Sequence, residues 1–550
     1  MLQKQYFLKL QLTFLIFAFG LFVLFLRYPF NPHEIGMDGF LYHEMTTILN
    51  RNCYAPWLLH PLSYWGFYPF SDSSAGPFIT GIISKTLNIS IESSILILSS
   101  FFSMFLFIIP LLIGLKYKRH IFSAVFLGII TSIAPIIFFS TQWELSERAG
   151  LVCFFSFILL IIMMIFEDKQ NINNRLYGIL FVSYIISTTI HKISFFILPI
   201  IIIFLIFRMI NKNNKLEGYI ASKSKKILFW SISIIISISI MIILSNYFNI
   251  GFFNFSNYSM GAIFNTNNVL GQFINLGITT IGGSGILVLI FGVLGFFSLI
   301  IDKIQKYKNS FFLISFIALF PFIPIRTYMR PLIPVLLEIF IFIGFIYTFE
   351  HIKSIKKYFP IFFITSILIA TSFSLGMNKY WNSQREGLAV ATPSEDIINL
   401  AAYIKQTDQY EQFSFSSTNG MTGLRIEAFT DIPFSPEPNS ALWYGFINKS
   451  KINIRSSTSI NDLSFYTSDT IFQIQTDWYK LYQNSINSSI VKNIILKYRI
   501  RYIVEDNAFP GKTSGYPIIQ PFDSNLLESI NNNNYVIYRD NSNSFIFISV

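Results

Sequence analysis

One carboxylate stands out by its position in the chain. Asp38 lies in the segment EIGMDGFLYHE (residues 34–44), which follows a hydrophobic stretch that ends near Phe30. An acidic side chain beside the hydrocarbon of a membrane costs free energy, so its presence at this position indicates a function. Such a carboxylate can act as a general base or orient an acceptor, and Tyr42 and His43 are candidates for contacts with the substrate or its phosphate. The alternative is that Asp38 only caps a helix or lies on the surface.

An acidic pair occurs in a later polar segment. In TQWELSER (residues 141–148), Glu144 and Glu147 are three residues apart. On one helical turn the two carboxylates would share a face and could hold a divalent cation, Mg or Mn, through oxygen ligands. No cofactor is otherwise indicated by the sequence. The alternative is a solvated loop in which a glutamate pairs locally with an arginine.

Four basic residues are candidates for binding a phosphate group. Arg326 and Arg330 are four residues apart, so on a helix they would project from one face, and guanidinium groups bind phosphate in a bidentate manner. His191 and Lys192 lie in a very short connection between two apolar stretches. The alternatives are that the arginines reach toward lipid headgroups and that His191 is structural.

The elements that must position these residues are predicted to be membrane-spanning helices. Hydrophobic residues make up 53% of the 550 residues and charged residues 13%, a composition unlike that of a soluble domain. Apolar runs long enough to cross a bilayer core of about 30 Å predict eleven spans. These spans are residues 7–29, 92–115, 121–140, 149–166, 175–190, 193–211, 226–246, 284–301, 310–325, 331–349 and 357–377. The apolar stretch 77–87 is too short to cross and is expected to be a half-inserted or surface helix.

Lysine and arginine residues in the loops predict the orientation in the membrane. If the N-terminus is cytoplasmic, nineteen of them fall on the cytoplasmic side and six on the opposite loops. We therefore predict a multi-pass protein of the cell membrane with a cytoplasmic N-terminus and an extracytoplasmic C-terminal part. The formal charge of +11 then results mainly from topology, so nucleic acid is not an expected partner.

A change in composition near Asn378 predicts two domains. Residues 1–377 form the membrane domain, with a long first outside loop at 30–76, and residues 378–550 form a soluble extracytoplasmic α/β domain. Short helices and strands are expected to alternate in the second domain. The helices are 394–405, 490–497 and 525–530, and the strands are 412–417, 499–505, 535–539 and 544–549.

Several segments resemble the GT-C superfamily of membrane glycosyltransferases. They are GMDGFLYH around Asp38, PLSYWGFYPFSDSSAGP at 61–77, Pro135 before an acidic loop, RTYMRPLIP at 326–334, and LKYRIRYIV at 496–504 in the C-terminal domain. The likeness covers most of the chain. It implies an α-helical polytopic membrane protein of the GT-C type with about eleven spans, followed by an extracytoplasmic α/β domain.

The resemblance also implies an activity. A hexosyl or pentosyl group would pass from a polyprenyl-phosphate carrier to a glycan, lipid or protein acceptor at the outer face of the bilayer. Asp38 would be the general base or acceptor-orienting carboxylate, and Arg326 and Arg330 would neutralise the leaving phosphate. Glu144 and Glu147 lie where oligosaccharyltransferase catalytic subunits carry a metal-binding acidic pair.

Two other functions compete with this interpretation. One is an oligosaccharide-transferring or ligase-type relative, but residues 378–550 lack the Trp-Trp of the motif by which oligosaccharyltransferases read the acceptor, so transfer to Asn-x-Ser/Thr is not expected. The other is a transporter or structural membrane protein. A transporter should show a repeated half and acids near the membrane midplane. The sequence shows no repeat, and the notable acids lie at the outer surface, with the exception of Glu338 inside the predicted span 331–349.

Overall fold

The chain folds into two compact units, each described separately below. The computed structural model describes residues 2–29, 33–36, 38–144, 146–167, 174–211, 284–301, 307–319, 331–353, 395–407, 413–457, 465–484, 488–506, 535–540 and 545–548. Unit 1 comprises Met1–Pro29, Ser99–Gln142 and Glu147–Trp381, and unit 2 comprises Phe30–Leu98, Trp143–Ser146 and Asn382–Val550. The first loop thus belongs to the same unit as the C-terminal part. The division into domains at residues 377 and 378 stays a prediction.

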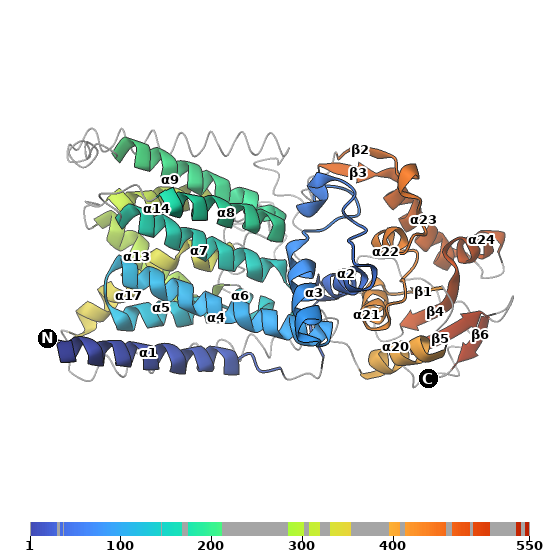
Figure 1. Cartoon of the computed structure of the whole chain (residues 1–550), viewed down its shortest axis with the longest axis horizontal. Helices are drawn as coiled ribbons and strands as arrows, with labels where there is room; N and C mark the ends of the chain where they lie inside the picture. Colours follow the sequence, from blue (N-terminus) through green and yellow to red (C-terminus); the bar gives the residue numbers. More distant parts are fainter. Residues whose placement is uncertain are drawn as a thin grey trace, which may run out of the picture. The chain divides into compact units, whose positions relative to one another are not determined.

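Unit 1 is built of apolar helices, among which α7 and α8 lie side by side (Figure 1). Its described helices are α1 (Leu2–Phe25), most of α4 (Ile91–Tyr117), α5 (Ile121–Ile133), α6 (Pro135–Ser140), α7 (Glu147–Glu167), α8 (Asn174–Ile190), η2 (Lys192–Ile197), α9 (Leu198–Asn211), α13 (Ile286–Ile301), α14 (Tyr307–Leu319), α16 (Leu332–Leu336) and α17 (Glu338–Lys353). The predicted spans 226–246 and 357–377 lie outside the described residues.

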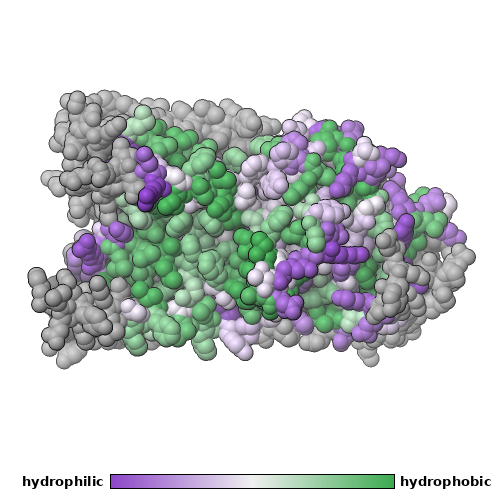
Figure 2. Space-filling model, in the orientation of Figure 1, coloured by the Kyte–Doolittle hydropathy of each residue, from purple (hydrophilic) through white to green (hydrophobic). Residues whose placement is uncertain are grey.

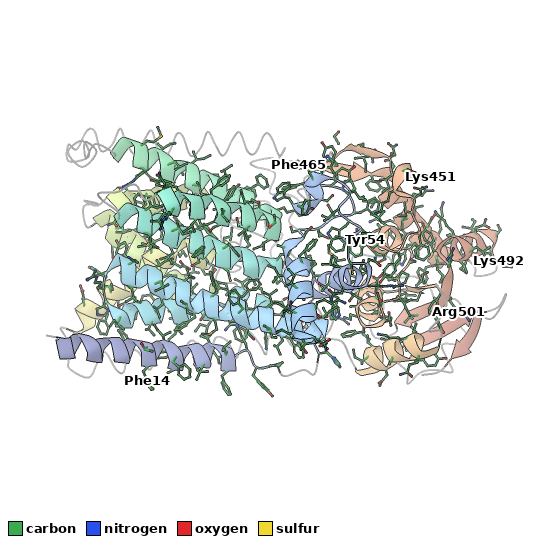
Figure 3. The ribbon with its side chains drawn as sticks, in the orientation of Figure 1. Phe14, Tyr54, Lys451, Phe465, Lys492 and Arg501 are labelled. Carbon is green, nitrogen blue, oxygen red and sulfur yellow. The ribbon has the colours of Figure 1, made fainter. Side chains whose placement is uncertain are left out.

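Three helical stretches are long and apolar enough to cross a membrane: Ile91–Tyr117, Glu147–Phe166 and Lys192–Met209. The outer face of α1 is also apolar, since Phe14 and Phe17 are 69% and 65% exposed. Figure 2 shows hydrophobic residues over the described helices of unit 1, and Figure 3 labels Phe14 on α1. Exposed apolar side chains of this kind suit contact with lipid. The chain is thus a multi-pass membrane protein, while the number of eleven spans stays a prediction.

The sequence explains a break in one predicted span. Residues 121–140 were expected to form a single helix, but α5 ends at Ile133 and α6 begins at Pro135. Proline has no backbone N–H to continue the helix and restricts the residue before it. Ala134 accordingly has φ −51° and ψ 129°, which is not helical.

Two charged side chains are buried inside unit 1 with polar partners. Arg27 donates to the Thr141 hydroxyl at 2.8 Å and to the carbonyl oxygens of Val23 and Ser132. Glu338, the acid within a predicted span, accepts from the Ser156 hydroxyl at 2.9 and 3.1 Å. This hydrogen bond connects α17 with α7 and accounts for a structural role of Glu338.

Helices α13 and α17 cross at two glycines. A Cβ atom on Gly295 would lie 1.8 Å from the carbonyl oxygen of Phe340, and one on Gly344 would lie 2.1 Å from that of Phe291. Small residues let helix backbones approach closely in membrane proteins. The two backbones here are in direct contact.

Unit 2 combines the first loop with the C-terminal part. The first loop supplies α2 (Asp38–Asn52) and η1 (Pro61–Tyr64), and α3 (Ala75–Leu87) begins at its end and contains the apolar stretch 77–87. The C-terminal part supplies α20 (Glu395–Thr407), β1 (Ser414–Ser417), α21 (Gly420–Thr430), α22 (Pro438–Trp443), η5 (Lys449–Lys451), β2 (Ile454–Ser456), β3 (Tyr466–Ser468), α23 (Asp469–Gln483), α24 (Ser489–Tyr498), β4 (Ile500–Asp506), β5 (Tyr535–Asp540) and β6 (Phe545–Ile548). These elements coincide with most of the helices and strands expected there. The expected helix 525–530 lies outside the described residues.

A four-stranded sheet in the order β1-β4-β5-β6 organises the C-terminal part of unit 2. β1 and β4 are parallel, and the other neighbours are antiparallel. Both faces of the strand β4 are covered: Ile500 and Ile503 pack with α23 and α24, whereas Tyr502 and Val504 pack with α20 and α21. Ile500 and Tyr502 lie on opposite faces although they are two residues apart, because the pairing of β1 with β4 shifts register between them.

Candidate active site

The segment that carries Asp38 is closely packed on its N-terminal side. Asp38 is the first residue of α2, and Gly36 precedes it with φ +110°, a conformation that favours glycine. A Cβ atom on Gly36 would lie 2.4 Å from the Glu144 side chain. Glu144 therefore rests against the backbone that leads into Asp38. The structure brings together this part of the first loop and the first acid of the predicted pair.

A network of histidines and carboxylates fixes the same segment. The Nδ1 atom of His43 lies 2.5 Å from Oε1 of Glu34, and Nδ1 of His33 lies 3.1 Å from Oε1 of Glu92. The backbone N–H of Glu34 donates to Oε1 of Glu92 at 2.8 Å. Trp143 closes the network, since its indole N–H donates to the Glu92 carbonyl at 3.0 Å and its carbonyl accepts from Ile35 at 3.1 Å.

The two members of the buried pair Glu34–His43 shift each other's pKa. Burial raises the pKa of Glu34, although His43 beside it acts in the opposite direction. Burial alone would lower the pKa of His43, but the Glu34 carboxyl outweighs it and raises that pKa above its usual value. Tyr42, the preceding residue of α2, is also buried. Tyr42 and His43 are thus anchored inside unit 2 near the start of the helix.

The other predicted site residues lie either in unit 1 or outside the described residues. Glu147 is the first residue of α7 and, like His191 and Lys192, belongs to unit 1. The ring of His191 accepts from the backbone N–H of Ile193 at 3.0 Å and so caps η2, which accounts for a structural role. Lys192 begins η2. Arg326 and Arg330 lie outside the described residues, so their convergence with Asp38 stays a prediction.

No group of three histidine, cysteine, aspartate or glutamate side chains is placed to hold a metal ion within the ranges that the structure describes. Two free cysteines occur there, the exposed Cys53 and the buried Cys153. A divalent cation on Glu144 and Glu147 therefore stays a prediction.

Sequence reasoning missed a second group of acids in unit 2. Glu44 on α2 and Glu427 on α21 are buried, and Glu437, which caps α22, is half-buried beside them. The carboxyls of Glu44 and Glu427 lie close enough to interact with each other, although the residues are almost 400 positions apart. Glu44 was visible as one more acid of the first loop. No local pattern in the sequence connects it with α21.

Comparison with known proteins identifies the class of fold. No family model and no curated protein sequence matches this chain. The solved structure of the archaeal oligosaccharyltransferase AglB from Archaeoglobus fulgidus, in complex with an inhibitory peptide and a dolichol-phosphate, is similar at a TM-score of 0.57, with 12% identity over 91% of this chain and 70% of that chain. A second Archaeoglobus fulgidus oligosaccharyltransferase structure, tethered with an acceptor peptide containing the NVT sequon, gives a TM-score of 0.61 at 12% identity, over 99% of this chain and 75% of that one.

A transferase of another kind has the same architecture. ArnT from Cupriavidus metallidurans in the apo state is similar at a TM-score of 0.50, with 11% identity over 90% of this chain and 93% of that chain. The chain therefore has the fold of GT-C membrane glycosyltransferases, and the resemblance found in the sequence is confirmed. Identities of 11% and 12% establish the fold alone.

Proposed function

We propose that this protein is a GT-C membrane glycosyltransferase that moves a sugar from a polyprenyl-phosphate carrier to an extracytoplasmic acceptor. The observation that supports this function best is the position of Asp38 in a GT-C fold. It begins the first helix after the apolar helix α1, in a segment held by Glu144 and by the Glu34–His43 pair. A rigid frame around a catalytic carboxylate reduces the cost of orienting the reactants.

The chemistry follows from the proposed donor. A nucleophilic oxygen or nitrogen of the acceptor attacks the anomeric carbon, the bond from that carbon to the phosphate oxygen breaks, and the polyprenyl phosphate leaves with the electron pair. Asp38 accepts the proton of the acceptor or orients it for attack. Arg326 and Arg330 stabilise the negative charge that develops on the leaving phosphate. His191 and Lys192 are the next candidates for that task.

Transfer of a preassembled glycan is the second candidate function. It is favoured by the higher TM-scores to the oligosaccharyltransferases than to ArnT. The three tryptophans of residues 378–550 are Trp381, Trp443 and Trp478, so no Trp-Trp pair is present to read a sequon. We therefore favour the transfer of a sugar to an acceptor other than Asn-x-Ser/Thr.

The full chain, purified and reconstituted into liposomes, tests the proposed function directly. Polyprenyl-phosphate donors that carry a labelled hexose, pentose or oligosaccharide are supplied with a membrane extract as the source of acceptor. We expect release of free polyprenyl phosphate together with labelled product for one donor class. A protein that consumes none of these donors would contradict the proposal, and one that consumes only the oligosaccharide donor would support the second candidate.

Removal of Arg330 should impair use of the donor. Charge-assisted hydrogen bonds contribute roughly 1.5 to 3 kcal/mol each, so we expect Arg330→Ala to lower donor use by about 10-fold or more. Arg330→Lys keeps the charge without the bidentate guanidinium and should recover part of the loss. The measurement is the dependence of transfer rate on donor concentration. Rates equal to the parent in both variants would make the arginine a membrane anchor only.

Chelation tests the predicted cation on Glu144 and Glu147. If Mg or Mn supports the reaction, treatment with EDTA should abolish transfer, and added cation should restore it. The treated protein is assayed with and without each metal salt. Full activity after thorough chelation would remove the metal from the mechanism and leave the role of Asp38 intact.

A further inference from the structure

Helix α2 packs on helix α21 inside unit 2. The ring of Phe429 lies 6.1 Å from that of Phe40 and 5.8 Å from that of His43, with edge-on geometry in both cases. Near the other end of α2, a guanidinium nitrogen of Arg51 lies 3.4 Å from an Asp431 carboxylate oxygen. Figure 3 labels Tyr54 just beyond the end of α2. The helix that begins at Asp38 is therefore supported along its length by α21 and the residue that follows it.

A pair of carboxyl groups occupies the centre of this interface. Glu44 is 1% exposed and Glu427 is 0% exposed. One oxygen of Glu44 accepts from the Ser440 hydroxyl at 3.4 Å, and one oxygen of Glu427 accepts from the backbone N–H of Phe434 at 2.9 Å. In both side chains the second carboxyl oxygen, Oε2, is buried and accepts no hydrogen bond from a donor group within the part of the chain that the structure describes.

The contact between the two carboxyls requires a proton. An ionised carboxylate can only accept hydrogen bonds, so two ionised groups cannot bond to each other. A proton on one of them creates the donor that the pair lacks. It also removes one of two like charges from a site without water contact, where such charges are most costly. A proton shared by the two carboxyls would therefore stabilise this interface.

One buried cation lies nearby: Arg425 of α21 is 2% exposed, and its guanidinium lies 5.8 Å from the centroid of the Phe40 ring. Burial raises the pKa of Glu427 to about 8 and that of Glu437 to about 7, and it raises the pKa of Glu44 well above its usual value, with Glu427 adding to the effect. Burial likewise raises the pKa of Asp431, which Arg51 opposes. The charged and titratable groups that face the pair are His43 and Arg51 on α2, Asp72 beside Glu437, Arg425 and Asp431 from the α21 segment, and Glu437 and Tyr444 around α22.

We propose that Glu44 and Glu427 are positioning residues: their shared proton holds α2 on α21 and thereby fixes the helix that begins at Asp38. Its effect on catalysis rests on the proposed function, whereas the contact between the helices does not. Neither residue touches the reacting atoms. The pair acts through the placement of α2.

The direction of the pH effect follows from the raised pKa values. A carboxyl whose pKa in the folded protein lies above its ordinary value stabilises the fold fully at low pH, and this contribution is lost as the pH rises through the folded pKa. For Glu427 the loss should run from its ordinary pKa of 4.5 to the raised pKa of about 8. Within this range each pH unit should favour separation of α2 from α21 by about 10-fold, and above it the effect should level off.

Hydrogen exchange on the full chain measures this separation without any assay of activity. Glu427→Gln supplies an N–H donor in place of the shared proton, and Asp469→Asn changes an exposed carboxylate on the same unit. The amides of α2 are compared among variants at the same pH, so the chemical rate of exchange cancels. At pH 4.5, the ordinary pKa of the group, we expect equal protection in the parent and in both variants. At pH 9 we expect exchange in the parent and in Asp469→Asn to be at least about 10-fold faster than in Glu427→Gln.

Glu44→Gln places the amide on the opposite side of the pair and should reproduce Glu427→Gln. Equal exchange in the parent and in both glutamine variants at pH 9 would overturn the proposal. Failure of both variants to fold would also overturn it, because an amide on either side replaces the protonated carboxyl.

In the reconstituted transfer assay, the parent should lose activity between pH 7 and 9 and the glutamine variants should not. Absence of transfer in every variant at every pH would refute the proposed function and leave the result of hydrogen exchange unaffected.

Discussion

Asp38→Asn is expected to lower the rate of glycosyl transfer by about 100-fold or more while the protein remains folded. Loss of a positioned general base commonly reduces a rate by 10² to 10⁴. Asparagine has the same shape as aspartate and can still accept a hydrogen bond, but it cannot take up the acceptor proton. The residue is the first of α2, and asparagine keeps its size and shape there, so the helix should be retained.

The measurement is the turnover of the reconstituted variant at saturating donor, with its thermal unfolding recorded in parallel. Asp469→Asn is the matched control, because it makes the same chemical change on an exposed residue that is paired with Arg455. We expect this control to transfer sugar at the rate of the parent. If Asp38→Asn also transfers at nearly that rate, Asp38 is a capping or surface acid and the general base must be sought elsewhere.

Features that depend on local sequence could be predicted well. The apolar runs led to helices such as α4 and α7, and the alternating segment at 499–505 led to the strand β4. The break between α5 and α6 follows from Pro135, whereas hydropathy alone predicts one helix over residues 121–140. In each case the deciding information lies within a few residues of the chain, where propensity and periodicity act.

The frame around Asp38 depends on contacts between distant segments and was only partly predictable. The segment 34–44 was recognised by its acid and its position after an apolar stretch. Its support by Glu92, by Glu144 and by the helix α21 requires knowledge of which elements meet in space. Burial then decides the protonation of groups such as Glu427, since the pKa of a carboxyl depends on its surroundings more than on its sequence neighbours.

The crossing of α13 and α17 should be the most sensitive point in the packing of unit 1. Gly344→Ala adds one Cβ atom 2.1 Å from the carbonyl oxygen of Phe291, and Gly295→Ala adds one 1.8 Å from that of Phe340. Both obstacles are backbone atoms, so no side-chain rotation can relieve the overlap and the helices must move apart. Overpacking of this kind costs about 3 kcal/mol, near the upper end of the usual range.

Gly178→Ala is the matched control for this prediction, since the same atom on α8 would meet nothing within 4 Å. In a membrane helix of unit 1, alanine there should leave the unfolding temperature unchanged or raise it slightly, because alanine favours the helix more than glycine does. Thermal unfolding of the purified full chain should show a large decrease for Gly295→Ala and Gly344→Ala, together with reduced yield. Unfolding temperatures within error of the Gly178→Ala control would mean that α13 and α17 do not approach as closely as their glycines allow.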